Sequence, residues 1–174
     1  RGELAGMYKE TGMAKLAGAC GYVQDLIEGG CKFLVFAHHR EVLDGLEAAV
    51  RKAKVGLIRI DGGVDASQRQ GLVDSFQKDE GVRVAVLGLT AAGVGLTLTA
   101  SSTVVFAELN WTPGVMVQAE DRVHRIGQRE CVNVHYLIGK GTLDDVIWPG
   151  IVRKLRVTSS FLDGNNEAVG GWQR

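Results

Sequence analysis

The chain has 174 residues, of which 45% are hydrophobic, and its 20 basic and 20 acidic side chains give a formal net charge of zero. This length favours one domain with its own core, and the balanced charge excludes a global field that would draw the chain to nucleic acid or to an acidic membrane. No apolar run approaches the roughly 20 residues of a membrane span, and the first residues lack a signal-peptide pattern. We therefore expect a soluble chain without a membrane partner.

Helical and strand patterns alternate along the sequence. Apolar residues at helical spacing predict a helix over residues 8–28, which the Gly29-Gly30 pair ends. The continuous run Lys32–Ala37 is typical of a parallel strand that is buried on both faces. The same signals predict helices over 40–53, 67–77, 113–125 and 143–155 and strands over 56–60, 83–87, 104–107 and 132–137.

Five strands separated by helices predict an α/β fold with a doubly wound parallel sheet. Ligands bind such sheets at the carboxyl ends of the strands, in the loops that lead into the helices. Polar or glycine-rich segments stand in four of these places, and together they predict a binding rim. The segments are His38–Arg40, Asp61–Gly63, Thr90–Gly95 and Glu108–Pro113.

Three cysteines, Cys20, Cys31 and Cys131, are an odd number without metal-site spacing. They are typical of reduced thiols in an intracellular protein, and they favour neither a disulfide framework nor a zinc site. The sequence starts at Arg1 instead of Met, and we expect it to be a fragment of a longer protein.

The segment Gln118–Gln128 carries two arginines, Arg122 and Arg125, that are three residues apart. On a helix they share one face, where two guanidinium groups could hold a polyphosphate and stabilise the charge of a phosphoryl-transfer transition state. Solvated surface charge is the usual role of such a pair, but the neighbouring Asp121 and the glycine that closes the segment's helix favour a function. We expect the pair to lie on the same rim as the strand-end segments.

No phosphate-binding element accompanies the arginines. The sequence lacks a glycine-rich loop ending in Gly-Lys-Ser or Gly-Lys-Thr, and it lacks an Asp-Glu metal box after a hydrophobic strand. The loop Thr90–Leu96 could approach a phosphate through its amides, although a Gly-x-Gly after a strand is more often a tight turn. Leu98 stands where a dinucleotide fingerprint needs its third glycine. The sequence thus predicts a domain that supplies arginines to a nucleotide held by another domain.

Three more residues are candidates for contact with nucleic acid. Arg69, at the start of a helix, could reach a phosphate backbone, while the Asp61–Gly63 turn before that helix is better explained as local structure. Trp111 could cap the core or stack on a sugar or base. His38 has no partner at metal-site spacing, so we interpret it as a polar loop residue near a phosphate and not as a zinc ligand.

Over residues 10–155 these segments, taken in order, resemble the second RecA-like lobe of superfamily 2 DNA translocases of the SWI/SNF type. The resemblance is carried by four motifs, of which the last matches almost letter for letter. They are Phe33–Phe36 (motif IV), Arg59–Gly62 with Arg69 (the next block), Leu87–Leu98 (motif V) and Gln118–Gln128 (motif VI). Three further segments are most similar to the annealing-helicase branch, whose members remodel stalled replication forks. They are Phe36–His39, Phe106–Leu109 and Trp111–Gly114.

The resemblance implies a RecA-like helicase lobe 2, which has the P-loop NTPase architecture without the P-loop. It implies that Arg122 and Arg125 are catalytic arginine fingers of an ATP-dependent DNA translocase or annealing helicase, whose ATP and Mg²⁺ are bound mainly by a first lobe. The residues implied to line the ATP interface are Gln118, Gly93, Gly95 and Asp121. The residues implied to contact DNA, chiefly its backbone, are His38, Arg69, Thr90 and Trp111.

The same resemblance implies partners, boundaries and a location. The partners are the first RecA-like lobe of the same protein and double-stranded or forked DNA, and the location is the nucleus. Residues 1–157 are expected to form the lobe with its N-terminal helix, and residues 158–174 a fraying tail. Without a phosphate loop and an acidic metal box, the chain alone is expected to be inactive. Thr97 and Glu108–Pro113 depart from the family's usual residues in ways that the annealing branch tolerates.

Two alternatives stay open. The chain could be lobe 2 of an RNA helicase, which would show ATP hydrolysis stimulated by RNA and strand separation. It could also be a degenerate lobe that serves as a protein-interaction module. The intact Gln118, Arg122 and Arg125 argue against the second alternative.

Overall fold

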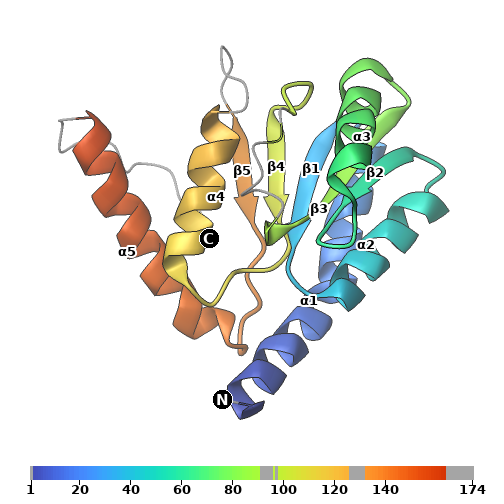
Figure 1. The fold of residues 1–174 in the computed structure, drawn as a ribbon. Helices are drawn as coiled ribbons and strands as arrows, with labels where there is room; N and C mark the ends of the chain where they lie inside the picture. Colours follow the sequence, from blue (N-terminus) through green and yellow to red (C-terminus); the bar gives the residue numbers. More distant parts are fainter. Residues whose placement is uncertain (1, 91–95, 97, 126–131, 164–174) are drawn as a thin grey trace.

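The structure is a computed structural model that describes residues 2–90, 96, 98–125 and 132–163 (Figure 1). A long first helix is followed by strands and helices. They are α1 (Gly2–Glu28), β1 (Phe33–Ala37), α2 (Arg40–Lys52), β2 (Gly56–Ile60), α3 (Ala66–Lys78), β3 (Val82–Gly88), β4 (Thr103–Phe106), α4 (Pro113–Arg125), β5 (Asn133–Tyr136) and α5 (Asp144–Asp163). After α1, strands and helices alternate, except that β4 follows β3 directly among the described elements. Every helix and strand predicted from the sequence is present.

The five strands form one sheet in the order β2-β3-β1-β4-β5, and every neighbouring pair is parallel. Parallel strands need crossover connections. Helices α2, α3 and α4 provide those from β1 to β2, from β2 to β3 and from β4 to β5, and they lie on both faces of the sheet. The structure therefore confirms the predicted α/β fold with a doubly wound parallel sheet.

Two hydrophobic cores lie on the two faces of the sheet. Successive residues of β1 alternate between them, because Leu34 and Phe36 belong to one core and Phe33 and Val35 to the other. Helices α3, α4 and α5 cover the first core, and α1 and α2 cover the second. Since every residue of β1 is buried, each large side chain there stabilises the fold by roughly 1.5–3 kcal/mol. This explains why the strand is apolar throughout.

Two helices are longer than the sequence pattern indicates. Helix α1 begins at Gly2. Its first turns leave Leu4 and Met7 48% and 47% exposed, so they show no buried apolar face that the sequence pattern could reveal. Helix α5 continues through Pro149 to Asp163 and so passes the domain boundary predicted at residue 157. The remainder of the predicted tail lies outside the described residues.

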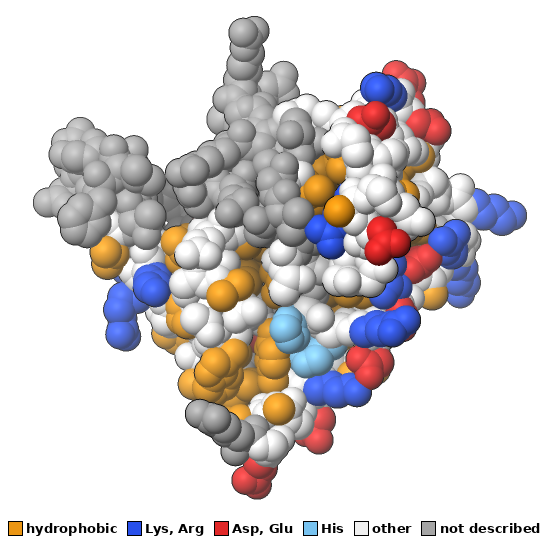
Figure 2. Space-filling model, in the orientation of Figure 1, with side chains coloured by type: hydrophobic (Ala, Val, Ile, Leu, Met, Phe, Trp, Pro, Cys, Tyr) orange, Lys and Arg blue, Asp and Glu red, His pale blue; other side chains and the backbone are white. Residues whose placement is uncertain are grey.

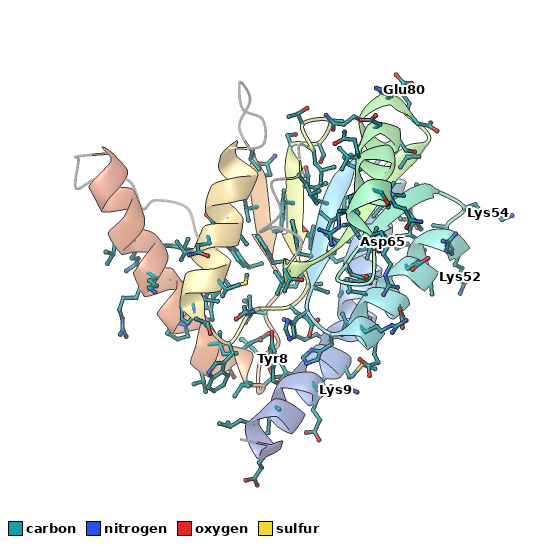
Figure 3. All side chains as sticks on the ribbon, viewed as in Figure 1. Tyr8, Lys9, Lys52, Lys54, Asp65 and Glu80 are labelled. Atoms are coloured by element: carbon teal, nitrogen blue, oxygen red, sulfur yellow. The ribbon has the colours of Figure 1, made fainter. Side chains whose placement is uncertain are left out.

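The first turns of α1 extend beyond the edge of the sheet at which the strands end (Figure 1). Tyr8 points from this part of α1 toward the strand-end loops, and Lys9 pairs with Glu41 in the first turn of α2 (Figure 3). At the other side of the same edge, Gly150 of α5 lets Pro113 approach closely, since a Cβ at position 150 would lie 3.3 Å from Cγ of Pro113. Three helices thus frame the loops that carry the candidate site.

The surface at this edge carries side chains of mixed kind. In the space-filling view, histidine side chains reach the surface between a group of hydrophobic side chains and a region where acidic and basic side chains alternate (Figure 2). No helix within the described ranges is long and apolar enough to cross a membrane. The mixed charge agrees with the zero formal net charge, so that any attraction for nucleic acid must come from a few local groups.

Candidate functional site

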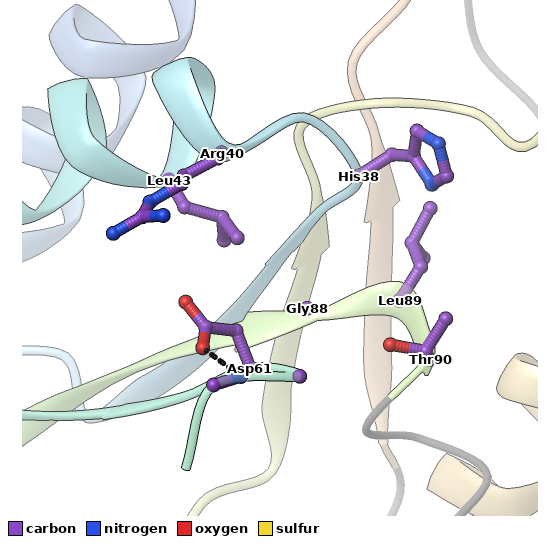
Figure 4. Close-up of a pocket in the computed structure, with 9 residues that line it drawn as sticks. His38, Arg40, Leu43, Asp61, Gly88, Leu89 and Thr90 are labelled. Carbon is purple, nitrogen blue, oxygen red and sulfur yellow. Dashed lines mark hydrogen bonds between the residues drawn. The ribbon is translucent and has the colours of Figure 1, made fainter.

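A pocket of about 270 Å³ opens at the carboxyl ends of β2, β3 and β1, which are neighbours in the sheet (Figure 4). Nine of the described residues line it, and they come from the ends of these strands and the segments that follow. They are His38, Arg40, Leu43, Asp61, Gly62, Gly63, Gly88, Leu89 and Thr90. Parallel pairing therefore brings together three of the four segments that the sequence predicts to form a rim.

The turn after β2 is held in place by Asp61. Its Oδ1 accepts a hydrogen bond from the amide of Gly63 at 2.9 Å, and its Oδ2 accepts one from Nε of Arg59, also at 2.9 Å. The Gly63 amide and the Arg59 guanidinium outweigh the effect of burial and lower the pKa of Asp61. The carboxylate is thus ionised at neutral pH, and its charge is engaged within the protein.

Arg59 is the centre of a small charge network beneath this turn. Its NH1 atom lies 2.5 Å from Oδ1 of Asp44 and 2.9 Å from Oε2 of Glu47. The hydrogen bond from Arg59 lowers the pKa of Glu47. The arginine side chain is only 18% exposed, so the network is a structural support and not a free cation for a ligand.

His38 stands at the mouth of the pocket, exposed on one side and packed on the other against Tyr8 and His39, with ring centroids 5.1 and 4.8 Å away. Partial burial, and then the charge of His39, lower the pKa of His38, although the carboxylate of Glu108 acts in the opposite direction. At neutral pH the ring is therefore uncharged. It can offer a hydrogen bond to a phosphate oxygen but not a positive charge.

Gly88, the last residue of β3, also lines the pocket. A Cβ at this position would lie 3.4 Å from Cβ of Asp61 and 3.8 Å from Oγ1 of Thr90, which are ordinary contact distances. Such a group would fit, but it would fill the space between the two residues. Arg40 is the one lysine or arginine among the nine described residues around this space. The pocket thus combines hydrogen-bonding groups, exposed glycine backbone and one permanent cation, which are groups that bind phosphate. The one carboxylate among the described lining residues, that of Asp61, is already bound by a guanidinium and a backbone amide.

Glu108 follows β4 directly and is 2% exposed. Its Oε2 accepts hydrogen bonds from the backbone amides of His38 and His39 at 2.7 and 2.8 Å, and its Oε1 lies 2.7 Å from Nδ1 of His39. A buried carboxylate needs such partners to offset the loss of hydration. Reasoning from the sequence missed this role, although an acidic residue directly after the apolar run 104–107 was a usable signal.

The remaining two residues expected to contact DNA do not line the pocket. Arg69 is partly buried, and its Nε donates a hydrogen bond to the carbonyl oxygen of Val64 at 3.1 Å. Trp111 is 45% exposed in the loop between β4 and α4, where the amide of Thr112 donates to Oδ1 of Asn110 at 2.8 Å. The structure therefore brings together His38 and Thr90 only. Trp111 keeps nearly half of its surface open to contact.

Helix α4 begins beside the strand-end loops and runs back along the sheet, so that its last turn lies toward the opposite edge (Figure 1). Arg122 and Arg125 belong to this last part. The expectation that they share a rim with His38, Thr90 and Trp111 is therefore wrong, because about 20 Å of helix separates the two ends of α4. Gln118, in the middle of α4, is exposed.

Several expectations concern residues about which the structure gives no side-chain information. The backbone of α4 includes Asp121, Arg122 and Arg125, but their side chains lie outside the described part of the structure. Gly93 and Gly95 lie outside it entirely. Cys20 and Cys31 are free thiols, whereas Cys131 is not described. Within the described residues, no group of three His, Cys, Asp or Glu side chains could hold a metal ion.

Comparison with known proteins identifies relatives over nearly the whole chain. The family described as the helicase conserved C-terminal domain matches residues 18–127, more than half of the chain. The DNA annealing helicase and endonuclease ZRANB3 of Mus musculus is 51% identical over 97% of this chain. The SWI/SNF-related matrix-associated actin-dependent regulator of chromatin subfamily A-like protein 1 of Xenopus tropicalis is 53% identical over 86% of it. The chain spans 16% of the length of each of these two relatives.

A solved structure supports the same relationship. The crystal structure of the C-terminal part of the Fun30 ATPase domain superposes with a TM-score of 0.66 and 31% sequence identity. The similarity covers 71% of this chain and 40% of that one. The fold is therefore shared with the C-terminal part of this ATPase domain.

Proposed function

Because this chain belongs to the helicase conserved C-terminal domain family, we propose that it is the second RecA-like lobe of an ATP-dependent DNA translocase that anneals or remodels branched and replication-fork DNA. The observation that carries this proposal is the pocket at the carboxyl ends of β1, β2 and β3, which presents His38, Thr90 and exposed glycine backbone. The name of the ZRANB3 relative, a DNA annealing helicase, supports the choice of DNA as substrate.

In this proposal the pocket binds the DNA backbone. Neutral hydrogen-bonding groups and backbone amides hold phosphate oxygens without reading bases, as a motor that moves along any sequence requires. Arg40 at the pocket edge adds one local positive charge. Trp111, exposed in the next strand-end loop, contacts a base or sugar that is unstacked at a fork. Arg69, which is tied to Val64, contributes at the flank.

The nucleotide is held between this chain and a first lobe of the same protein. ATP with Mg²⁺ supplies the free energy of phosphoryl transfer when it is bound there. Gln118 and Asp121 of α4, with Gly93 and Gly95, line the interface on this side. Arg122 and Arg125 act as arginine fingers, which stabilise the negative charge on the transferring phosphoryl group. The isolated chain is inactive, because it lacks the phosphate loop and the acidic metal box.

The test is ATP hydrolysis by the full-length protein with forked DNA, duplex DNA and RNA as stimulants. We expect stimulation by DNA, greatest with the fork, and a fall of roughly two or more decades in turnover for Arg125→Ala. Arg153→Ala, which removes an exposed arginine of α5, is the matched control and should leave turnover unchanged. Normal turnover of Arg125→Ala would contradict the finger role and favour a protein-interaction module. Stimulation by RNA alone would favour an RNA helicase.

The nuclear location follows from the same proposal, because replication forks are nuclear in the animals that carry the relatives named above. Microscopy of the tagged full-length protein in its own cells provides the measurement. Exclusion of the protein from the nucleus would contradict a role at replication forks.

A further inference from the structure

The N-terminal half of α1 touches two strand-end loops at once. The hydroxyl of Tyr8 donates a hydrogen bond to the carbonyl oxygen of Leu109 at 2.6 Å. The ring of Tyr8 packs against His38 and His39, with centroids 5.1 and 4.7 Å away. Burial, and then the charge of Glu108, raise the pKa of Tyr8 above its usual range, so the hydroxyl keeps its proton. Tyr8 thereby links the loop after β1 to the loop after β4.

One turn further along, Gly12 packs directly on Glu108. A Cβ at position 12 would overlap Oε1 of Glu108 and would lie 3.3 Å from Cγ2 of Val42. Gly12 is buried, so neither neighbour can move aside into solvent. The absence of a side chain at this position therefore makes room for the carboxylate that holds the amides of His38 and His39.

Tyr8 and Gly12 lie before the part of the chain that is matched to the family. The match to the helicase conserved C-terminal domain begins at residue 18, whereas Tyr8 and Gly12 precede it. Their contact with the strand-end loops joins α1 to the matched part of the chain, and it reaches the loop that contributes His38 to the pocket.

We propose that Glu108 is a positioning residue for DNA binding, which Tyr8 and Gly12 of α1 hold in place so that it fixes the loop of His38. Glu108 is too deeply buried to touch DNA itself. It acts through the backbone amides of His38 and His39, from which it accepts hydrogen bonds. This inference rests on the proposed function, because it assigns the cause of the pocket's affinity for DNA. Displacing Glu108 weakens DNA binding while the nucleotide end of α4 stays intact.

The test compares Gly12→Ala with Gly18→Ala in the full-length protein. Both substitutions add a methyl group to the same helix, but the Cβ at position 18 would meet nothing within 4 Å. For Gly12→Ala we expect the DNA concentration that half-saturates ATP hydrolysis to rise about tenfold, the effect of losing one or two hydrogen bonds to the ligand. Turnover at saturating DNA should stay within about twofold, and Gly18→Ala should match the wild type in both quantities.

Substitutions at Glu108 provide a second, independent readout. Glu108→Ala removes the acceptor of both amides and should also raise the half-saturating DNA concentration about tenfold. Glu108→Gln keeps an acceptor oxygen of the same reach and should retain most of the wild-type affinity. Tyr8→Phe removes one hydroxyl only and is the variant to measure if the larger changes prevent folding. We expect it to raise the half-saturating DNA concentration about threefold.

The outcomes separate this inference from the function on which it rests. If the wild-type protein shows no stimulation by DNA, the proposed function itself is wrong. In a second outcome, the wild type responds to DNA while the folded Gly12→Ala and Glu108→Ala variants half-saturate at the same DNA concentration as the wild type. That result overturns only the positioning role. Tyr8→Phe takes the place of these two variants if they do not fold. A loss of turnover at saturating DNA without a change in half-saturation would also overturn it, because that result points to the nucleotide site.

Discussion

Lys15 of α1 and Asp144 of α5 form an ion pair in which Nζ lies 2.6 Å from Oδ2 and the two side chains are only 7% and 1% exposed. The amide of Gly139 donates a second contact to the same oxygen at 2.9 Å, whereas Nζ makes no hydrogen bond of good geometry in the described structure. The pair is thus mainly Coulombic. It joins the start of the chain to its last described helix.

Removing the lysine should destabilise the fold strongly. Lys15→Met leaves the charge of Asp144 buried without its partner, and we expect the free energy of unfolding of residues 1–174 to fall by about 3–5 kcal/mol in urea titrations. Lys15→Met combined with Asp144→Leu should recover much of this loss. The control is Lys9→Met, because Lys9 pairs with Glu41 while both side chains are about half exposed, and its cost should stay below about 1 kcal/mol. Equal costs for the two lysines would contradict the role of burial.

The Arg59 network should make stability depend on acid. The pKa values of Glu47 and Asp61 are lowered in the folded chain. Their contribution is therefore present above the ordinary values of 4.5 and 3.8, and it is lost as the pH falls through the lower folded-state values. We expect Arg59→Met to cost about 1–3 kcal/mol near neutral pH and progressively less below about pH 4.5.

Denaturant titrations of both chains across this pH range provide the measurement. Arg51→Met is the control, since Arg51 also pairs with Glu47 but its side chain is 67% exposed; we expect a cost within about 0.5 kcal/mol. If the loss of unfolding free energy caused by Arg59→Met stayed constant with pH, Arg59 would not stabilise the ionised forms of Glu47 and Asp61.

The exposed indole of Trp111 should contribute to binding forked DNA. We expect Trp111→Ala in the full-length protein to weaken binding roughly 5- to 100-fold, the range for losing one base stacked on an aromatic side chain. Fluorescence anisotropy at fixed salt measures the affinity. Met13→Ala, which truncates another large side chain that is 43% exposed, should not change it. The same affinity for Trp111→Ala and wild type would remove Trp111 from the DNA interface.

The fold was predictable because its signals are local. The continuous apolar run at β1 reflects burial on both faces, and the amphipathic spacing of α2 reflects burial of Val42, Leu43, Leu46 and Val50 on one side only. The first turns of α1 were not predicted, because Leu4 and Met7 there are exposed and leave no apolar face. Where a helix forms without burying a face, the sequence pattern carries little information.

The site was predictable only in part, because its contacts are distant in sequence. The topological rule located His38 and Thr90 correctly at one edge of the sheet. It did not reveal that Glu108 binds the loop of His38, because the acidic residue after the run 104–107 marks a strand end and does not name its partner. Nor did it reveal that Lys15 meets Asp144, a pair 129 positions apart in the sequence. The arginines of α4 were predicted at the wrong edge because only the start of this helix lies at the strand-end loops, whereas Arg122 and Arg125 lie toward its other end.

The direction of α4 also gives the domain a mechanical property. The helix starts next to the Trp111 loop and ends at Arg125 without interruption, as a stiff rod about 20 Å long. Because packed helices shift as whole bodies and resist local deformation, a push on its first turn tilts its last one. In the proposed function, this rigid helix therefore connects the DNA contact at Trp111 with the nucleotide contact at Arg125.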